Sequence, residues 1–394
     1  MSLLSVSDAQ QRLFALAGAA ETEVAPLSDA IGRWLSSDVA ALRSQPWTDL
    51  SAMDGYAICH ADLPGSWTII GESAAGGEAP SAIQPGQAMR IFTGAAMPDG
   101  ADCVLIQEEA ERSGDRLILT GEGPDRPGKH VRKQGSDFTA GAPLLPKGAR
   151  IGAPQAALAA IGGHGALPVR RRITVAMFST GNELVEPGRQ AHPSQLPASN
   201  GVMLAAMLKG LPVIVEDLGI IADDLQAQTD AFRRAAKADV IVTTGGASVG
   251  DHDLVKPAFE AAGGSLDFWR IALRPGKPLM AGRNGDALFL GLPGNPVSAF
   301  VTATLFLLPL IRHMSGASDP LPPQVRATLT EPLPSNAARA QYVRGQLSAG
   351  TVRPLGDQDS AALRALAGAN ALIVRPPHAP AAQPGETVEC IPLD

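Results

Sequence analysis

The sequence predicts an α/β multidomain protein whose central domain has three layers around a parallel sheet. Around it we expect an N-terminal helical part, a small all-β subdomain and a C-terminal β-barrel-like domain. Strand-like and helical patterns alternate in the middle third, short β-rich runs between turn residues precede them, and β segments return near the end. The implied domains are residues 1–44 with 140–170 (helical and linker), 45–139 (small β), 171–318 (α/β) and 319–394 (C-terminal β).

The 394 residues have the composition of a globular protein, with 45% hydrophobic and 18% charged residues. A net charge of −7 argues against a nucleic-acid binder that depends on general positive charge, and any anionic ligand must be met by local cations or a metal. Three scattered cysteines (Cys59, Cys103 and Cys390) indicate a reducing cytoplasm. The opening stretch indicates a capped amphipathic helix and not a leader, and the apolar run at 299–311 predicts a buried core helix and not a membrane span.

The N-terminal third predicts two helices and then a set of short strands. The stretch that starts near Ser7 and the segment "PLSDAIGRWLSSDV" are typical of helices. The runs "SWTIIGE", "AMRIFTG", "CVLIQEE" and "RLILTGE" are typical of strands, because glycine, proline and aspartate turns separate them. A helix with proline in its first turn is expected at residues 154–163.

The middle third predicts four strands, each followed by a turn and a helix. The strands are "ITVAMF", "PVIVEDLGII", "DVIVTTGG" and "ALFLGL". Asp223 and Gln226 predict a capping box for the helix after the second strand, and a helix is expected from near Asp253 after the third. Strands that alternate with helices at this spacing predict a parallel sheet with right-handed crossovers.

Three strand-to-helix turns are the candidate ligand-binding loops: "STGNEL", "TTGGASVGDHD" and "GLPGNPVS". In an open parallel sheet such turns lie at the carboxyl ends of the strands, where ligands bind. Their glycines let backbone N–H groups approach an anion, and each turn leads toward a helix N-terminus. The candidate substrate-binding residues are Gly245, Gly246, Ser248, Gly250, Pro293, Asn295 and Pro296.

Carboxylates accompany these turns. Glu183 lies in the first turn, Asp223 follows the second strand, and Asp253 follows the third. Hard oxygen ligands beside a phosphate-holding loop are what Mg²⁺ requires, so these three acids are the candidate metal ligands. The alternative for Asp223 and for Asp253 is that each caps the helix that follows it.

Cations gather downstream, in the segment "WRIALRPGKP". Arg274 and Lys277 flank a proline–glycine bend, which suits a tetrahedral oxyanion bound by charge-assisted hydrogen bonds, with Arg270 nearby. The alternative is a solvated basic turn. No nucleophile–base pair is visible in the sequence, and His252 is expected to be a spectator.

Together these motifs resemble one known family. The segments "SAMDGYA", Thr93–Gly94, "STGNEL", "TTGGASVG" followed by Asp253, "RPGKP" and "GLPGNPVS" occur in the family's order and spacing. The chain resembles the molybdopterin molybdenumtransferases, the MoeA family that includes the E domain of gephyrin. The resemblance spans nearly the whole chain, and the ordered set is far more specific than any one motif.

The resemblance implies an elongated subunit in a homodimer that hydrolyses adenylated molybdopterin, inserts molybdate and releases AMP. The functional residues carried over are the acids Asp54, Glu183, Asp223 and Asp253 with Thr93, and the molybdate-site residues Ser248, Arg274, Lys277, Pro278 and Arg344. It implies that Asp54 and Thr93 reach the cleft from the partner subunit. It also implies a place in the cytoplasm, with the molybdopterin adenylyltransferase and molybdoenzyme chaperones as further partners, and no nucleic acid or membrane.

Two alternatives remain at this point. One is the preceding reaction, adenylation of molybdopterin, whose usual carriers lack the "SAMDGYA" β region and the C-terminal domain. The other is a non-catalytic scaffold of the gephyrin E-domain type, which has no need of Glu183, Asp253 and "RPGKP" together. The sequence also departs from the family pattern at Ala198, Ala247 and Arg274, where aspartate, valine and lysine are common.

Overall fold

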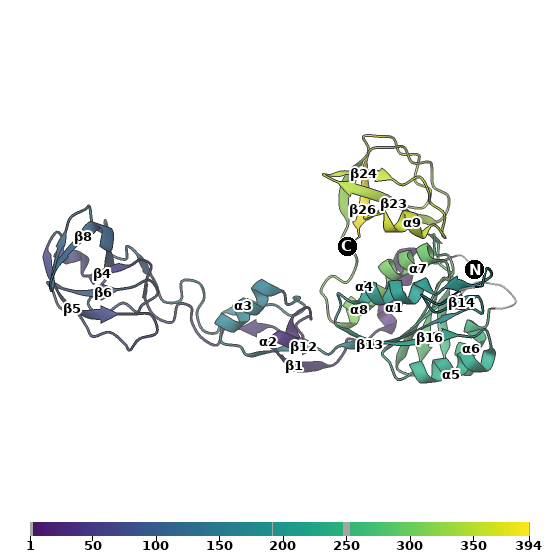
Figure 1. Ribbon diagram of the computed structural model, residues 1–394, viewed down its shortest axis with the longest axis horizontal. Coiled ribbons are helices and arrows are strands. Elements are labelled where there is room, and N and C mark those ends of the chain that lie inside the picture. The colour runs from purple at the N-terminus through teal and green to yellow at the C-terminus, as the bar shows by residue number, and fades with distance from the viewer. Residues whose placement is uncertain (1–2, 191, 247–252, 394) are drawn as a thin grey trace.

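The protein is elongated, with a small β domain at one end and an α/β domain at the other (Figure 1). A slender middle part joins them, and a separate C-terminal β domain sits beside the α/β domain (Figure 1). The computed structural model describes residues 3–190, 192–246 and 253–393. The predicted α/β multidomain class, with an all-β part and a C-terminal barrel, is confirmed.

The α/β domain is built on a six-stranded sheet with the order β16-β13-β17-β21-β20-β18. Its strands are β13 (Ile173–Thr180), β16 (Val213–Ile221), β17 (Val240–Thr244), β18 (Ser265–Trp269), β20 (Met280–Asn284) and β21 (Ala287–Leu292). The first four strands in this order are parallel, as predicted, but β20 runs antiparallel to its two neighbours, β21 and β18. The physical reason is the connection from β20 to β21, a tight turn at Gly285 that leaves no chain for a crossover.

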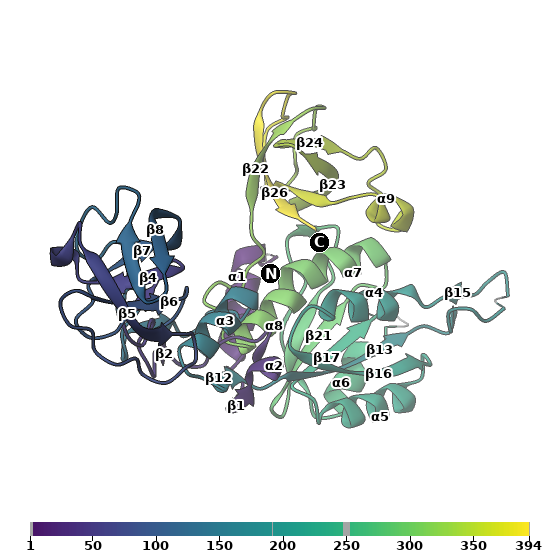
Figure 2. The ribbon, with the colours of Figure 1, turned by 60° about the vertical axis from the view of Figure 1, so that its left-hand side comes forward.

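Helices cover both faces of this sheet and make the expected three layers (Figure 2). They are α1 (Val6–Leu16), α4 (Ser199–Leu208), α5 (Leu225–Ala235), α6 (Val255–Ala261), α7 (Pro296–Thr302), the π-helical turn η3 (Ala303–Leu307) and α8 (Leu308–Met314). Phe232 of α5 and Phe259 of α6 pack against Phe178 and Phe289 of the sheet on one face. Leu13 of α1 belongs to the core on the other face, although the sequence grouped residues 1–44 with the linker part.

The apolar run at residues 299–311 forms part of the buried core helix that the sequence predicts. By length and composition one helix among the described residues, Pro296–Met314, is long and apolar enough to cross a membrane. However, 78% of its most apolar window is buried inside the protein.

The small β domain is a six-stranded sheet with the order β7-β4-β6-β5-β9-β8. Its strands are β4 (Gly55–Ile58), β5 (Ser66–Ser73), β6 (Gln87–Ile91), β7 (Cys103–Ile106), β8 (Ala110–Ser113) and β9 (Arg116–Leu119), with the short pair β3 (Leu50–Ser51) and β10 (Val131–Arg132) and the 3-10 turns η1 (His60–Asp62) and η2 (Gln107–Glu109). Trp67, which is 1% exposed, fills its core with Ile58 and Leu117.

The middle part contains two pairs of short antiparallel strands. β1 (Thr22–Pro26) pairs antiparallel with β12 (Ala166–Arg170), and β2 (Val39–Ala40) pairs with β11 (Pro143–Leu145). Two short helices, α2 (Leu27–Ala30) and α3 (Ala153–Ile161), complete a small core around Leu35 and Leu167.

The C-terminal domain is a closed barrel. Its strands are β22 (Val325–Leu329), β23 (Ala340–Ser348), β24 (Thr351–Pro354), β25 (Ala371–Arg375) and β26 (Thr387–Pro392), and its helix is α9 (Leu363–Ala367). β23 pairs with both β24 and β25, which closes the five strands on themselves and leaves few free edges. A two-residue strand of the α/β domain, β19 (Leu273–Arg274), adds to the start of β23.

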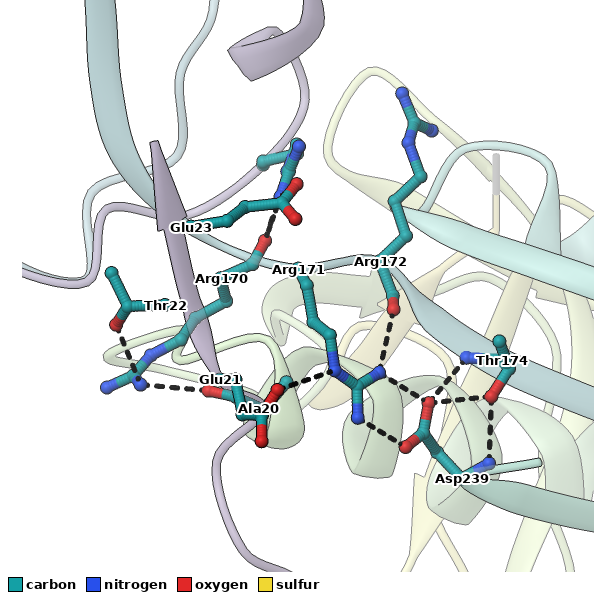
Figure 3. Close-up of polar contacts among 10 residues, drawn as sticks. Ala20, Glu21, Thr22, Glu23, Arg170, Arg171, Arg172, Thr174 and Asp239 are labelled. Atoms are coloured by element: carbon teal, nitrogen blue, oxygen red, sulfur yellow. Dashed lines mark hydrogen bonds and ion pairs between the residues drawn. The ribbon is translucent and has the colours of Figure 1, made fainter. Parts of the chain in front are cut away.

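Charged groups hold the joint between the middle part and the α/β domain (Figure 3). Arg171 donates from Nη1 and Nη2 to both carboxylate oxygens of Asp239, at 2.8 and 2.7 Å. Asp239 also accepts from the backbone N–H and the hydroxyl of Thr174 on β13, at 2.7 and 2.8 Å. Next to it, Arg170 donates to the carbonyl of Ala20 at 2.8 Å, so both connecting segments are tied down.

This cluster predicts an acid-sensitive contribution to stability. Burial opposes ionisation of Asp239, but the hydrogen bonds from Arg171 and Thr174 outweigh it and lower the pKa of the carboxyl. Ionised Asp239 therefore stabilises the fold above the pKa of the unfolded chain, about 3.9, and this contribution is lost as the pH falls through the lower folded value. We expect Asp239→Asn to lower the free energy of unfolding at pH 7 by about 2 kcal/mol, and with it the unfolding temperature.

Thermal unfolding followed by circular dichroism at pH 7 and near pH 3 would measure this. The difference between wild type and Asp239→Asn should shrink at the acid end. The matched control is Glu21→Gln, since Glu21 is exposed and 3.8 Å from Arg171, and it should change little. If Asp239→Asn lowered the unfolding temperature by the same amount at both pH values, ionisation of Asp239 would not be the source of its contribution to stability.

Candidate active site

The ends of three parallel strands form the floor of one cleft. Ser179 of β13 pairs with Thr244 of β17, and Thr244 pairs with Leu292 of β21, so the three strands end at the same level. The cleft that opens there has a volume of about 820 Å³. All three predicted turns contribute to its lining, which includes Gly181, Glu183, Asp223, Gly245, Gly246, Asp253, Pro278, Pro293, Asn295 and Pro296.

The turn after β17 needs glycine for steric reasons. Gly245 and Gly246 both have positive φ, +95° and +56°. A Cβ at Gly245 would lie 2.4 Å from the carbonyl oxygen of Thr180, and one at Gly246 would lie 2.3 Å from a methyl of Val255. The turn therefore packs its backbone directly against β13 and α6. Ser248 and Gly250, also predicted for this turn, lie outside the described residues, as does His252.

Asp223 does not cap the helix that follows it. The cap of α5 is the next residue, Asp224, whose Oδ1 accepts from the N–H of Ala227 at 2.8 Å. Asp223 instead forms a reciprocal pair with Asn182: each accepts the backbone N–H of the other on its side-chain oxygen, at 3.0 Å. The pair ties the end of β16 to the turn that carries Glu183, which brings two of the predicted acids to the same rim.

Asp253 is not a cap either. Helix α6 begins at Val255 after Leu254, and neither carboxylate oxygen of Asp253 has a hydrogen-bond partner within the described ranges. Burial raises the pKa of Asp253 to about 6, and the charge of Asp223 adds to the rise. The amide of Val255 lies near enough to oppose it without making a hydrogen bond of good geometry. A half-buried carboxyl without partners is an acceptor that a ligand or cation can use.

These acids could hold a magnesium ion only if the substrate's phosphates and water supplied its remaining ligands. In the part of the chain that the structure describes, no group of three histidine, cysteine, aspartate or glutamate residues could hold a metal alone. Asp253 has two free oxygens, and Glu183 and Asp223 line the same cleft. Mg²⁺ commonly takes one or two carboxylates and completes its six oxygens from phosphates and water, which matches this arrangement.

The predicted cation loop reaches the cleft at its edge. Pro278 lines the cleft directly, and the exposed Arg274 and Lys277 precede it on the connection from β19 to β20. Neither side chain has an ion pair among residues 3–190, 192–246 and 253–393, so both charges are available. Arg270 differs: its guanidinium stacks 4.2 Å from the ring centre of Trp269.

Arg344 does not line the cleft, although the resemblance assigns it to the molybdate site. It is 1% exposed, and its guanidinium donates to backbone carbonyls of the barrel. Arg344 is also not among the lining residues of this cleft, and its assignment to the molybdate site stays a prediction of the resemblance.

Asp54 and Thr93 lie in the small β domain, at the far end of the same chain from the cleft (Figure 1). The two are brought together: Asp54 accepts the backbone N–H of Thr93 at 2.7 Å and its hydroxyl at 2.9 Å. The hydrogen bond from the Thr93 backbone, followed by that from its side chain, lowers the pKa of Asp54. The pair is thus preformed and exposed, but not part of this chain's own cleft.

Sequence reasoning missed two sets of lining residues. Buried polar side chains form part of the floor: Ser179, Thr180, Asn200, Thr244 and Ser298. A signal existed for most of them, since serine or threonine ends apolar strands just before a glycine turn. Ala361 and Leu363 of the barrel also line the cleft, and no local pattern could have indicated them.

Comparisons with known proteins agree with this architecture. The chain matches, in order, the MoeA N-terminal region (domains I and II) over residues 4–163, the "Probable molybdopterin binding domain" over 176–313 and the MoeA C-terminal region (domain IV) over 326–393. Molybdopterin molybdenumtransferase 2 of Mycobacterium tuberculosis (strain CDC 1551 / Oshkosh) is 37% identical over 385 residues, 94% of each chain. The molybdopterin molybdenumtransferase of Haemophilus influenzae is 34% identical and covers 95% of this chain and 94% of its own.

A solved structure supports the same conclusion. The molybdopterin biosynthesis MoeA protein of Pyrococcus horikoshii OT3 has a TM-score of 0.85 at 26% identity, over 99% of both chains. The chain therefore belongs to the molybdopterin molybdenumtransferase family, a family of transferases, and the resemblance in its motifs is confirmed.

The carboxyl of Asp253, which has no hydrogen-bond partner among the described residues, predicts a pH-dependent contribution to stability. Its folded pKa of about 6 lies above the usual value of 3.8, so the folded state holds this proton more tightly. Stability is therefore lost as the pH rises through about 4 to 6, when the buried group must ionise. We expect Asp253→Asn to unfold about 2 °C above the wild type at pH 8, and at nearly the same temperature near pH 4.

The control is Asp224→Asn, because asparagine is as good a helix cap as aspartate and should change little at either pH. Differential scanning calorimetry at the two pH values would decide. A gain for Asp253→Asn that is equal at both pH values would show that the charge of Asp253 is not its source.

Proposed function

We propose that this protein inserts molybdate into adenylated molybdopterin, releases AMP and requires Mg²⁺. The observation that carries the proposal is the convergence of three features on one cleft. They are the carboxylate of Asp253, which has no partner among the described residues, the glycine turn after β17, and the loop of Arg274 and Lys277, which lines the cleft at Pro278. Family membership supports the molybdopterin part, since the similar proteins are named for that transfer.

In this proposal backbone groups hold the diphosphate of the substrate. Gly245 and Gly246 line the cleft without side chains, so a diphosphate can approach their backbone N–H groups. The first turn of α7, which follows Asn295, opens on the same cleft and adds the positive end of a helix dipole. An acidic protein can therefore bind a polyanion here by local donors, in spite of its net charge.

Glu183, Asp223 and Asp253 would hold Mg²⁺ together with phosphate oxygens. When bound, the ion would polarise a phosphoryl oxygen and stabilise the charge on departing AMP. The reciprocal pair of Asp223 with Asn182 orients one acid before any ligand arrives. The cation also relieves the cost of ionising Asp253 in its half-buried position.

Arg274, Lys277 and the backbone at Pro278 would bind molybdate, which is a dianion. Arginine offers two parallel donors and lysine a point charge, which together suit a tetrahedral oxyanion. The acids and the cations approach the cleft from different loops, so the metal and the oxyanion have separate subsites.

We further propose a cytoplasmic homodimer in which Asp54 and Thr93 of one chain complete the cleft of the other. Both are exposed and already hydrogen-bonded to each other, and the slender middle part holds them away from their own cleft. The molybdopterin adenylyltransferase is the natural supplier of the substrate, and molybdoenzyme chaperones are candidate acceptors of the product.

Two other functions are less well supported. An adenylyltransferase would leave the flanking regions, matched over residues 4–163 and 326–393, without a role. A pure scaffold would gain nothing from keeping Asp253 half-buried and unpartnered, since that arrangement costs stability at neutral pH.

The proposal predicts that Asp253→Ala and Lys277→Ala each lower molybdate-dependent AMP release by about 100-fold or more while the fold stays intact. Removal of either group leaves one charged subsite without its partner in the transition state. Purified protein would be mixed with adenylated molybdopterin, Mg²⁺ and molybdate, and AMP would be quantified by chromatography.

The matched control for Lys277→Ala is Lys237→Ala, an exposed lysine of the same domain between α5 and β17, at the opposite edge of the sheet. It should retain wild-type activity. Equal AMP release from Asp253→Ala, Lys277→Ala and the wild type would end the assignment, and no release from the wild type would favour the scaffold.

A further inference from the structure

The cation loop, residues 270–278, begins next to a tryptophan that two cations contact. Trp269 is the last residue of β18, and the guanidinium of the following residue, Arg270, lies 4.2 Å from the centre of its ring. The ammonium of Lys256, on α6, lies 5.6 Å from the same centre. The negative face of an indole ring attracts cations more strongly than that of the other aromatic side chains. The ring therefore connects the start of the cation loop with the helix that follows Asp253.

The ring of Trp269 is itself fixed in place. Trp269 pairs with Met280 of β20, in the central sheet of the domain. Its side chain packs against the phenylalanine core that joins the sheet to α5 and α6. The indole thus belongs to a rigid part of the domain, and long charged side chains that contact it are held to that part.

Arg270 has a backbone conformation that arginine rarely adopts. Its φ is +75°, which costs free energy for any residue with a Cβ and persists where surrounding contacts determine it. Its N–H donates to the carbonyl of Leu279 at 3.1 Å, and the N–H of Ile271 donates to the carbonyl of Lys277 at 3.0 Å. The sharp bend at Arg270 therefore brings the two ends of the cation loop together.

The closed loop presents the proposed oxyanion residues. Arg274 pairs with Gln341 of β23, which fixes the loop on the barrel. Gly276 has a φ of +109°, and a Cβ there would lie 2.6 Å from a methyl of Thr302 on α7. The middle of the loop thus rests on the barrel and on α7, and the ring of Trp269 fixes its start against α6.

Helix α6 lies on the side of the acids. Lys256 is in its first turn, three positions after Asp253. The ammonium of Lys256 also lies 3.9 Å from the carboxylate of Glu260, but an exposed ion pair of this length contributes little. The ring of Trp269 lies within the distance of about 6 Å at which a cation is attracted to it.

We propose that Trp269 is a positioning residue that holds the start of the cation loop against α6, so that Arg274 and Lys277 keep their place relative to Asp253. Trp269 is not among the residues that line the cleft, and it acts through the loop without touching a ligand. The inference rests on the proposed function for what the loop binds, but not for the contacts of the ring.

Two substitutions of Trp269 separate the ring from its size. Trp269→Leu removes the aromatic face. Trp269→Phe keeps a weaker one and loses an indole N–H that has no hydrogen-bond partner among the described residues. The matched control is Trp34→Leu, because Trp34 is 6% exposed and has the guanidinium of Arg150 5.3 Å from its ring centre, in the middle part of the chain. Both leucine variants lose an indole and a cation contact, but only one borders the cation loop.

The first measurement is hydrogen exchange of the full chain, followed by mass spectrometry. We expect Trp269→Leu to speed exchange in peptides spanning residues 270–279 by about tenfold or more, since the hydrogen bonds that close the loop open more often. Trp269→Phe should have a smaller effect, and Trp34→Leu none in these peptides. Unchanged exchange in Trp269→Leu would overturn the proposal, whatever reaction the protein catalyses.

The second measurement is the dependence of AMP release on molybdate concentration. We expect Trp269→Leu to raise the KM for molybdate by about tenfold or more with kcat within about threefold of the wild type, and Trp269→Phe to lie between them. A variant that was only less stable would contain less active enzyme and keep its KM. An unchanged KM in Trp269→Leu, or an equal rise in Trp34→Leu, would contradict the positioning role.

A third variant, Arg270→Gly, distinguishes positioning from direct binding. Glycine adopts a φ of this sign without strain, so the substitution removes the cation and leaves the bend. We expect a KM for molybdate close to that of Trp269→Leu. A raised KM in Arg270→Gly together with a wild-type KM in Trp269→Leu would make Arg270 an oxyanion ligand and overturn the proposal. A wild type that releases no AMP would refute the proposed function, and the exchange measurement would still decide the role of Trp269.

Discussion

The level at which the parallel strands end is the constraint on which the whole site depends. Ser179, Thr244 and Leu292 lie side by side in register, so the turns that follow them must share one edge of the sheet. Because parallel neighbours need a crossover helix, every turn also leads toward a helix N-terminus on that edge. A slip of one residue between β13 and β17 would move every side chain of one strand to the other face of the sheet and offset the two turns. The register thus brings loops from distant parts of the chain together, and contacts such as the reciprocal pair of Asp223 with Asn182 then fix them.

The electrostatics of the cleft follow from this convergence. Register brings Asp223 and Asp253 close enough for one to raise the pKa of the other, and burial adds the larger share. Natural chains avoid buried carboxyls without partners unless something else requires them, since the arrangement costs stability at neutral pH. Elsewhere in the same domain, Asp239 shows the opposite solution, because Arg171 and Thr174 satisfy it fully. This contrast is the basis on which we propose Asp253 as a ligand-binding group.

The sequence predicted what depends on neighbours along the chain and missed what depends on packing. The three turns, their glycines and the acids Glu183, Asp223 and Asp253 were visible, because strand ends and turn residues have local signatures. The capping role was assigned one residue early, to Asp223 in place of Asp224, since both can cap and only the backbone at the helix start decides. The antiparallel β20 was missed because a short apolar run has no direction of its own. Arg344 carries a charge that suggested a ligand, and no local pattern showed that it is buried among backbone carbonyls.

Two domains outside the α/β domain position residues for the site: the C-terminal barrel and the small β domain. The barrel contributes to the cleft through β23, which pairs with β19 at Arg274, and through Ala361 and Leu363 in its lining. The small β domain holds Asp54 and Thr93 ready at the end of an arm whose joint is fixed by Arg171 and Asp239 (Figure 3). The bidentate ion pair opposes bending at this joint, and the tip lies away from its own cleft (Figure 1). If the pair at the tip acts in catalysis, it must act on a second copy of the chain, and the stiffness of the joint is then what allows two copies to register with each other.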